Sequence, residues 1–395
     1  MRVIGMISGT SMDGIDVAVA DLSLHDGEVE LRPLAATSLP YAPDLRAALG
    51  AVLPPATTTA AEVCRLDNLI GQAFADAARF AIKELAGGEV DLVVSHGQTI
   101  YHWLADDGHV LGTLQIGQPA WIAEATGVPV VADLRTRDVA SGGHGAPLAS
   151  LFDHLLLGGS DQPTAALNLG GIANLTIVNP SGDTLAFDTG PASALIDAAV
   201  GHLTGGAESF DRDGARARRG RVRADLVDRL LAEPYYGKPP PKSTGKELFH
   251  LTYLMEQADA IGAIEPDDLV ATVTALSAIT VADACRRHGV RRVVASGGGV
   301  ANLALMEMLK HELPDTEITT IDELGIPADA KEAYFFAVIG FLTIHQLPGN
   351  LPSATGADHP AVLGCVLPGR DGFPVFERGS ASPTRLVVVG GDRSG

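Results

Sequence analysis

The sequence predicts an α/β protein built from two related domains. At 395 residues the chain exceeds the length at which a single hydrophobic core usually stops growing. Short apolar runs of strand type alternate with long helical segments, a pattern typical of α/β folds. A strand, a glycine-rich turn and a second strand open the chain near residue 1, and the same order returns near residue 164. We therefore expect a duplicated architecture without a duplicated sequence.

The first half predicts three strands, a long helix and a strand that ends in polar residues. The opening strand-like runs are Val3–Ile7, Ile15–Leu22 and Glu28–Leu39. A helical segment from Ala60 to Leu85 stops at Gly87-Gly88, a common signal for a helix end. The buried-type strand Leu92–Val94 leads into the polar run Ser95–Thr99. Ligands in α/β folds bind at such carboxyl ends of strands.

The second half repeats this plan. Thr164–Val178 reads as strand, glycine turn and strand, and Thr184–Pro191 reads as a third strand that ends in a polar turn. A long helix over Asp267–His288 then precedes a buried strand, Val293–Ala295. The last strong helical segment, residues 328–345, is expected to pack back on the first domain.

These elements predict a division of the chain into three parts. Residues 1–134 form an N-terminal lobe, and residues 135–367 form a C-terminal lobe. Residues 368–395 are rich in glycine and proline and are expected to form a poorly ordered tail.

Composition limits the classes of function. The formal net charge of -20 and the pI near 4.9 argue against a nucleic-acid partner or an anionic membrane surface. No apolar run in the sequence reaches the length of a membrane span, and the first apolar stretch does not read as a signal peptide. The three cysteines lie far apart and form neither a disulfide framework nor a zinc pattern. We therefore expect a cytoplasmic protein.

The first glycine turn is GTSMDGID, Gly9–Asp16. It lacks the lysine of a Walker phosphate loop, and Asp13 stands where a serine nucleophile elbow needs glycine. Glycine N–H groups and the hydroxyls of Thr10 and Ser11 can bind phosphate oxygens. Asp13 and Asp16 would repel a bare phosphate, so a nucleotide with Mg²⁺ fits better. The alternative is a tight turn with no ligand.

Two further glycine-rich segments also favour a nucleotide-binding site. LNLGGIAN places Gly170-Gly171 in a second hairpin, which could hold phosphate together with the first. SGGGVAN places Gly297–Gly299 between a buried strand and a helix, where backbone can approach a flat ligand such as adenine. Each segment alone is also compatible with an ordinary turn or helix entry.

The motif FDTGP supplies a candidate general base. Asp188 stands at the end of a strand beside a glycine turn, where a carboxylate can accept a proton. An Asx turn that satisfies local amides is the alternative. Four histidines in the first half have irregular spacing and match no zinc pattern.

Ten sequence blocks occur in one order that resembles a known family. They are GTSMDGID, SHGQT, DLR–D (Asp133 to Asp138), GGHGAPL, NLGGIAN, FDTGP, PPPKSTGKE, SGGGVAN, KEA (Lys331–Ala333) and NLPSATGA. Over roughly residues 3–365 the chain is similar to the anhydro-N-acetylmuramic acid kinase family of the actin/Hsp70/sugar-kinase superfamily. The resemblance implies a two-lobed fold of duplicated RNase H-like domains with a central ATP cleft. It also implies phosphorylation of the 6-oxygen of 1,6-anhydro-N-acetylmuramic acid while water opens the anhydro bridge, a step in peptidoglycan recycling.

The resemblance also implies site residues and cofactors. The cofactors are ATP and Mg²⁺, with the metal near Asp13, and Asp188 activates water. The ATP-binding residues are Gly9, Thr10, Ser11, Met12, Asp13, Gly14, Ile15, Asp16, Gly170, Gly171, Gly297, Gly298, Gly299 and Asn302. The residues on the sugar side are His96, Gln98, Arg135, Asp138 and Glu332. The partners are the anhydrosugar and ATP, and a homodimer is possible.

The chain departs from the family pattern at three places, four residues in all, and these departures concern the choice of sugar. His144 stands where the family usually has glutamine, Ala192-Ser193 replace Gly-Asn after DTGP, and Leu134 replaces phenylalanine after Asp133. The alternative functions are a kinase for levoglucosan, the plain 1,6-anhydroglucose, and a sugar-sensing nucleotide-binding protein without catalysis.

Overall fold

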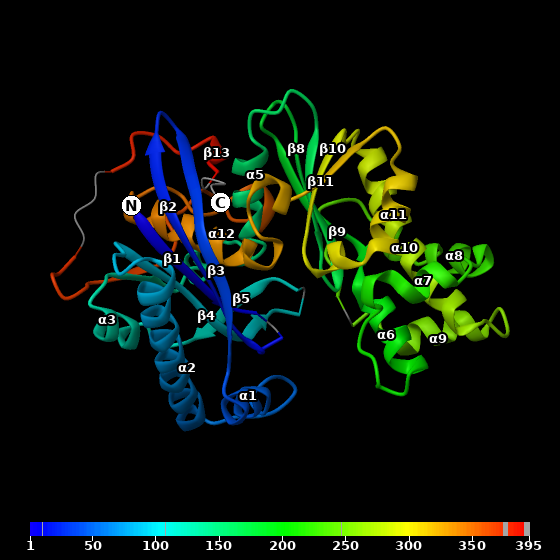
Figure 1. The fold of residues 1–395 in the computed structure, drawn as a ribbon, viewed down its shortest axis with the longest axis horizontal. Helices are drawn as coiled ribbons and strands as arrows, with labels where there is room; N and C mark the ends of the chain where they lie inside the picture. Colours follow the sequence, from blue (N-terminus) through cyan, green and yellow to red (C-terminus); the bar gives the residue numbers. More distant parts are fainter. Residues whose placement is uncertain (10, 107, 246, 374–377, 391–395) are drawn as a thin grey trace. The chain divides into compact units, whose positions relative to one another are not determined.

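The computed structural model describes residues 1–9, 11–106, 108–245, 247–373 and 378–390. The chain forms two compact units (Figure 1). Unit 1 consists of Met1–Leu156 and Gly325–Gly395, and unit 2 consists of Leu157–Leu324. Each unit is an α/β structure with one mixed sheet, so the α/β fold class is confirmed.

Unit 1 contains an eight-stranded sheet in the order β12-β6-β4-β1-β2-β3-β13, with β5 paired to β4. The strands are β1 (Arg2–Ser8), β2 (Gly14–His25), β3 (Glu28–Pro40), β4 (Leu92–Leu104), β5 (Val110–Ile116), β6 (Val130–Ala132), β12 (Cys365–Leu367) and β13 (Arg385–Val388). The helices are α1 (Pro43–Gly50), α2 (Ala60–Phe80), α3 (Ala120–Thr126), α4 (Thr136–Ala140), α5 (Ala149–Leu157), α12 (Lys331–Ile344) and α13 (Pro352–Thr355). A π-helical turn, Ala81–Leu85, continues α2, so the expected single helix over 60–85 changes its hydrogen bonding near its end.

Unit 2 contains a five-stranded sheet in the order β11-β10-β7-β8-β9. The strands are β7 (Thr164–Leu169), β8 (Ile172–Val178), β9 (Thr184–Pro191), β10 (Arg292–Ser296) and β11 (Glu317–Thr320). The helices are α6 (Ser193–Leu203), α7 (Ala215–Arg219), α8 (Ala224–Leu231), α9 (Leu251–Asp259), α10 (Pro266–Arg287) and α11 (Leu303–Glu312). Short 3₁₀ turns cover Arg212–Gly214, Pro234–Gly237 and Gly298–Ala301 here, and Asp322–Leu324 and Ala328–Ala330 at the return to unit 1.

The strand order shows the duplication directly. In unit 1 the order β3-β2-β1-β4-β6 has β2 antiparallel to both neighbours and the remaining pairs parallel. In unit 2 the order β9-β8-β7-β10-β11 has the same directions, with β8 as the antiparallel strand. This is the RNase H-like arrangement in both units. The duplicated plan that the sequence predicts is therefore present in the topology.

Helices cover the sheet of unit 1 on both faces. Ile4 and Met6 of β1 pack in one core with Phe74 of α2. On the other face, Gly5 of β1 lies directly against the backbone of α12 at Ala333, and a Cβ at residue 5 would collide with it. The alternation of side chains along β1 thus assigns one face to α2 and the other to α12.

Helix α10 is the central helix of unit 2. One part of it packs with β7, β8 and α11, and the other with α6, α8 and α9. By length and composition α10 could cross a membrane, but 83% of the apolar window is buried inside the protein. Its apolar character is explained by its place in the core.

The boundaries of the units differ from the expected 134/135 division. Residues 135–156 and 346–367, expected in the C-terminal lobe, belong to unit 1. The segment 328–345 also belongs to unit 1, in agreement with the expectation that it packs back on the first domain. Buried Lys331 and Asp153 form an ion pair of 2.7 Å in this region, and β12 pairs with β6. In the expected tail, β13 pairs in parallel with β3. These contacts join segments more than 175 residues apart, so local sequence patterns do not reveal them.

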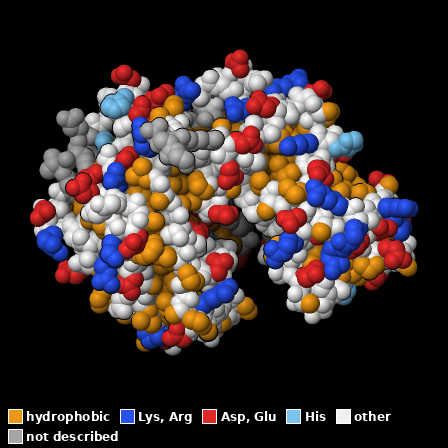
Figure 2. All heavy atoms as spheres, in the orientation of Figure 1, with side chains coloured by type: hydrophobic (Ala, Val, Ile, Leu, Met, Phe, Trp, Pro, Cys, Tyr) orange, Lys and Arg blue, Asp and Glu red, His pale blue; other side chains and the backbone are white. Residues whose placement is uncertain are grey.

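The basic run Arg216–Arg223 is neutralised by acidic partners. Arg216 and Arg219 both pair with Asp267, at 3.3 and 2.8 Å, and Arg218 pairs with Glu307. On the face shown in Figure 2, acidic and basic side chains are interspersed. The run is therefore a solvated surface whose arginines are mostly paired with acidic side chains.

Candidate active site residues in the two units

The first glycine turn joins β1 to β2. Ser11 and Asp13 are exposed, and the Ser11 hydroxyl donates a hydrogen bond of 2.7 Å to Asp13 Oδ1. The Met12 amide donates to the Gly9 carbonyl at 3.2 Å, and Met12 has a φ of 52°, in the left-handed region. Thr10 lies outside the described residues. The turn thus presents oxygen atoms at its rim while its own backbone fixes its shape.

Gly9 and Gly14 of this turn differ in the space that is open to a side chain. Gly14 is the first residue of β2 and pairs with Pro40 of β3. A Cβ at Gly14 would collide with the carbonyl of Leu39, so the sheet itself excludes a side chain there. At Gly9 the nearest atom to an added Cβ is Ser11 Oγ, at 3.8 Å. Only Gly9 leaves open space in which a ligand could approach the backbone.

Ile15 and Asp16, which end the motif, differ in environment. Ile15 is 2% exposed and belongs to the core beside α2. Asp16 is half-buried, and burial raises the pKa of its carboxyl group. Nearby Asp13 and Asp329 raise this pKa further, while a hydrogen bond with Ser38 lowers it. Asp16 is therefore held in an acidic environment that a cation would relieve.

Gln98 lies behind the first glycine turn. The Ser8 hydroxyl donates to Gln98 Oε1 at 2.6 Å, and Gln98 Nε2 donates to the carbonyls of Gly9 at 3.2 Å and Thr99 at 3.1 Å. The Gln98 side chain is buried, and these bonds use its oxygen and its amide hydrogens. Gln98 thus positions the glycine turn, a contact that its place in the sequence does not reveal.

The buried His96 forms a pair with the partly buried Arg135. Arg135 Nε donates to His96 Nε2 at 2.7 Å, and His96 Nδ1 lies 3.0 Å from the Gly97 carbonyl. A guanidinium group only donates, so His96 Nε2 accepts and the proton resides on Nδ1. Burial and the charge of Arg135 hold the pKa of His96 well below its usual value. The imidazole is therefore neutral and orients Arg135.

Arg135 uses only part of its donor capacity in these contacts. Its Nη1 donates to the Gly145 carbonyl at 2.7 Å, and its guanidinium carbon lies 5.9 Å from the centre of the Phe336 ring. Among the described residues, no acceptor contacts Nη2. Burial lowers the pKa of Arg135, while Glu332 and Asp138 raise it. Arg135 therefore keeps a fixed, charged donor that is free to bind a ligand.

Asp138 connects two of the family blocks. Its side chain has no exposed area; Oδ1 accepts from Asn350 Nδ2 at 2.7 Å and Thr355 Oγ1 at 2.8 Å. Oδ2 accepts from the Gly145 amide at 2.8 Å. The carboxylate thereby fixes the loop that carries the Gly145 carbonyl, the acceptor for Arg135.

Glu332 stands in the first turn of α12 and is exposed to solvent. The protein atoms around the carboxyl group partly desolvate it and raise its pKa, and Asp16 raises it further. Arg135 and Lys331 act in the opposite direction. Glu332 is thus within electrostatic reach of both Asp16 and Arg135 in unit 1.

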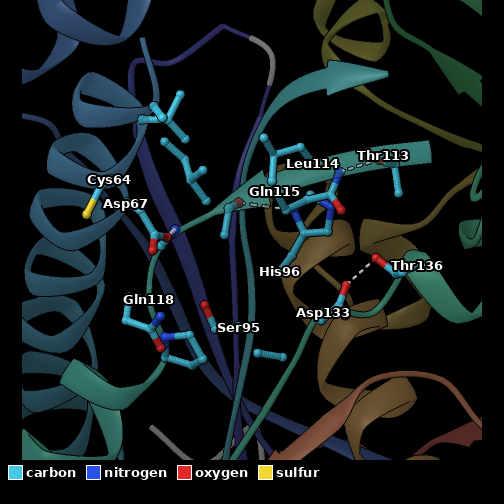
Figure 3. Close-up of a pocket in the computed structure, with 17 residues that line it drawn as sticks. Cys64, Asp67, Ser95, His96, Thr113, Leu114, Gln115, Gln118, Asp133 and Thr136 are labelled. Atoms are coloured by element: carbon cyan, nitrogen blue, oxygen red, sulfur yellow. Dashed lines mark hydrogen bonds between the residues drawn. The ribbon is translucent and has the colours of Figure 1, made fainter. Parts of the chain in front are cut away.

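A cavity of about 640 Å³ opens beside His96 in unit 1 (Figure 3). Ser95 and His96 of β4 line it together with Asp133 and Thr136, which share a hydrogen bond of 2.5 Å. Among the described residues, the buried Ser95 hydroxyl has no hydrogen-bond partner. Unpaired buried polar atoms are uncommon in native proteins, so this hydroxyl is available to a ligand. The strand expected to end at Val94 continues as β4 to Leu104, so SHGQT lies within the strand. The motif pointed to His96 as a site residue, but not to the cavity or to the participation of Asp133 and Thr136.

In unit 2 the second glycine hairpin contacts the start of α6. The carbonyls of Gly170 and Gly171 accept hydrogen bonds of 2.9–3.0 Å from the amides of Ala192, Ser193 and Ala194. Among the described residues, no acceptor contacts the N–H groups of Gly170 and Gly171. The carbonyls of the hairpin thus bind the amides at the start of α6. The N–H groups of the two glycines remain available to an anion.

The SGGG segment packs against the end of β7. An added Cβ at Gly297, which has a φ of 85°, or at Gly299 would meet the Leu169 carbonyl at 2.9 Å. Gly298 is exposed, with nothing within 4 Å of an added Cβ. Asn302 caps α11, since its side chain accepts from the Leu305 amide at 3.1 Å. Only Gly298 therefore offers open backbone in this segment.

Asp188 is held from three sides. Its Oδ2 accepts from the Thr244 amide at 2.9 Å, its own amide donates to the Lys242 carbonyl at 3.0 Å, and the Tyr235 hydroxyl donates to its carbonyl at 2.7 Å. Burial raises the pKa of the carboxyl group; the Thr244 hydrogen bond lowers it and Glu247 raises it. No described residue contacts Oδ1. Asp188 is a positioned carboxylate with one free oxygen and increased basicity.

A model of the family described as anhydro-N-acetylmuramic acid kinase matches residues 1–369. The chain belongs to the anhydro-N-acetylmuramic acid kinase family. The anhydro-N-acetylmuramic acid kinase of Streptomyces coelicolor is 56% identical to it over 391 residues, which cover 99% of this chain and all of that protein. The protein of that name from Rhodococcus erythropolis is 53% identical over 395 residues and covers 98% and 99% of the two chains. Among solved structures, a ROK hexokinase from Thermus thermophilus aligns with 17% identity and a TM-score of 0.36, over 86% of this chain and 99% of the other.

Two departures from the pattern of this family lie at backbone contacts. His144 is exposed, and its amide donates to the Thr355 carbonyl at 2.9 Å. Ala192 and Ser193 contact the second glycine hairpin through their amides. Any residue except proline can make these bonds. The departures therefore leave the two anchoring contacts unchanged.

Proposed function

We propose that the protein phosphorylates the 6-oxygen of 1,6-anhydro-N-acetylmuramic acid with ATP while water opens the 1,6-anhydro bridge. The products are N-acetylmuramic acid 6-phosphate and ADP. The observation that carries this proposal is the family match over residues 1–369. The held carboxylate of Asp188 supplies the chemistry that such a reaction needs.

Asp188 acts as the general base in this proposal. Hydrolysis of a glycosidic bond with inversion ordinarily needs a carboxylate to activate water and an acid to protonate the leaving oxygen. Here the γ-phosphoryl group captures the leaving oxygen, so one carboxylate is sufficient. The free Oδ1 of Asp188 takes the proton of the water, and the Thr244 amide keeps the other oxygen in place. The raised pKa strengthens the base.

The phosphates of ATP bind at the two glycine turns. At Gly9 and Gly170 an added Cβ would meet no atom closer than 3.5 Å, and Ser11 and Asp13 add polar side chains. Gly298 faces the adenosine, while Gly14, Ile15, Gly297, Gly299 and Asn302 support the shape of these segments. Met12 gives the first turn its left-handed bend.

Asp13 and Asp16 fit a bound Mg²⁺. Magnesium prefers oxygen ligands and is commonly held by one or two carboxylates plus phosphates and water. Among the described residues, no group of three or more histidine, cysteine or acidic side chains could hold a metal alone. A carboxylate pair that shares its ion with a nucleotide agrees with this. When bound, the ion neutralises phosphate charge during transfer.

The sugar side lies in unit 1. Arg135 Nη2 donates to the substrate, His96 and Asp138 hold Arg135 and its loop, and Gln98 holds the first turn. Glu332 accepts a hydroxyl hydrogen bond. The 640 Å³ cavity has a volume usual for a small-molecule site. The Ser95 hydroxyl is its unpaired polar group.

The reaction takes place in the cytoplasm, where ATP is available and the free thiols of Cys64, Cys285 and Cys365 stay reduced. We expect neither a nucleic acid nor a membrane as partner, because the protein carries a formal net charge of -20. Light scattering coupled to size-exclusion chromatography distinguishes a homodimer from a monomer.

The test is a panel of anhydrosugars. Purified protein with Mg-ATP is given either 1,6-anhydro-N-acetylmuramic acid or levoglucosan, and ADP release is followed. A site that bonds the N-acetyl and lactyl groups should give a kcat/KM at least ~10²-fold higher for the muramic sugar. Equal or reversed preference would assign the protein to levoglucosan. ADP release with neither sugar would favour a sensor.

A further inference from the structure

Unit 2 contains a second cavity, of about 150 Å³, on the side of β9 that faces α10. The segment 236–242 closes it. Its apolar wall consists of Phe187, Leu231, Pro239, Pro240 and Ala284. A cavity of this volume can hold an apolar group the size of benzene, which is called the body of the ligand below.

Three cations converge on this cavity. Lys238, Lys242 and Arg287 line it. Among the described residues, Lys238 and Arg287 have no acidic partner, and both are exposed. Burial and the charges of Arg287 and Lys238 lower the pKa of Lys242, as expected where like charges lie close together.

The remaining titratable groups at the wall do not cancel this charge. Asp283 is paired with Arg286 at 2.5 Å. His288 packs its ring on Phe187, with the ring centres 5.4 Å apart. Among the described residues that line the cavity, the cations therefore outnumber the single carboxylate, Asp283, which is already paired.

Two donors at the wall have unused capacity. The Tyr236 hydroxyl is buried and has no hydrogen-bond partner among the described residues. Lys242 Nζ donates to the carbonyls of Tyr235 at 3.1 Å and Tyr236 at 3.2 Å and lies 4.5 Å from the centre of the Tyr235 ring. Among the described residues, its third N–H has no acceptor oxygen. A buried donor without an acceptor is unfavourable, so an anion here would satisfy groups that the fold leaves unpaired.

We propose that this cavity binds a small organic anion with a benzene-sized apolar body and one carboxylate or phosphate head. The body lies against Phe187 and Pro240. The head accepts from Lys242 and Arg287 at the mouth. From the wall, the Tyr236 hydroxyl donates a hydrogen bond to an oxygen of the same head.

The ligand is coupled to Asp188 through the segment that closes the cavity. The Lys242 carbonyl accepts from the Asp188 amide, and the Thr244 amide donates to Asp188 Oδ2. A ligand that immobilises residues 236–242 also immobilises these two contacts. The regulatory meaning of this coupling rests on the proposed role of Asp188, whereas the binding itself does not.

The test is calorimetric titration with benzoate and phenyl phosphate in the absence of ATP and sugar, so a failed kinase assay does not affect it. Inorganic phosphate, which lacks the body, and benzyl alcohol, which lacks the charge, should each bind at least about tenfold more weakly. Arg287→Gln should weaken benzoate binding by about tenfold or more. The matched control is Arg286→Gln, which alters the neighbouring arginine that pairs with Asp283.

Tyr236→Phe removes only the unpaired hydroxyl. It should raise the melting temperature of the free protein and weaken benzoate binding. Hydrogen exchange should show slower exchange across residues 236–244 when benzoate is bound. Absence of benzoate binding at 10 mM, equal losses in Arg286→Gln and Arg287→Gln, or binding of phosphate alone as tightly as benzoate would each overturn the site. Unchanged exchange with benzoate bound would overturn the coupling.

Discussion

Replacement of Asp138 by asparagine should destabilise unit 1 through a single hydrogen-bonding conflict. The buried carboxylate accepts from Asn350, Thr355 and the Gly145 amide. Asparagine has the same size but only one acceptor oxygen, so its NH₂ group must face a donor. A hydrogen bond to a charged group contributes about 1.5–3 kcal/mol, and a buried unsatisfied donor costs about 1–3 kcal/mol. We expect a loss of about 3 kcal/mol in the free energy of unfolding.

The assay is urea unfolding at pH 7, with Asp133→Asn as the matched control. Asp133 lies five residues earlier, is exposed, and has a φ of 55°, which asparagine tolerates. The control should stay within about 0.5 kcal/mol of wild type. Because Asp138 holds the loop that binds Arg135, the Asn variant should also lose affinity for the sugar more than for ATP. A stability within 0.5 kcal/mol of wild type for Asp138→Asn would refute the reasoning.

Three further variants test the roles of single residues. Gly9→Val should weaken Mg-ATP binding in a folded protein, while Gly50→Val, at an exposed helix end, should not; equal nucleotide affinities would remove Gly9 from the phosphate site. A lysine ammonium carries its donors on one atom and does not reproduce the separate Nε and Nη1 donors of Arg135. With Arg135→Lys the KM for the sugar should therefore rise about 10–100-fold, with Arg137→Lys unchanged. Burial raises the pKa of Asp188 in the folded state, so its ionised form opposes folding above the unfolded pKa of about 4. Asp188→Asn should therefore melt at a higher temperature than wild type at pH 7 but not at pH 3, and its turnover should fall about 10²–10⁴-fold. A stability gain that persists at pH 3, or normal turnover, would contradict the role given to Asp188.

The sequence predicted the elements of the fold better than their grouping. Both glycine hairpins lie between the expected strands because glycine turns and apolar runs are local signals. The division of the units was not predictable, because it depends on contacts such as Asp138 with Asn350 and Thr355, more than 200 residues apart. No local pattern carries that information.

The contacts that a motif residue makes were also harder to predict than its membership of the motif. Gly14 reads as a phosphate-binding glycine, yet the backbone of β3 excludes a side chain there. Gln98 belongs to a sugar-side motif, yet its amide supports the first glycine turn. The cavity beside Ser95 combines residues from several elements and became visible only in the structure.

The fate of the attacking oxygen tests the central claim most directly. The protein is given Mg-ATP and 1,6-anhydro-N-acetylmuramic acid in ¹⁸O-water for one turnover, and the product is analysed by mass spectrometry. If Asp188 directs water to the anomeric carbon while the 6-oxygen takes the γ-phosphoryl group, the label appears at the anomeric carbon and the phosphate stays unlabelled. Label in the phosphate group, or ADP formed with the anhydro bridge intact, would contradict the account.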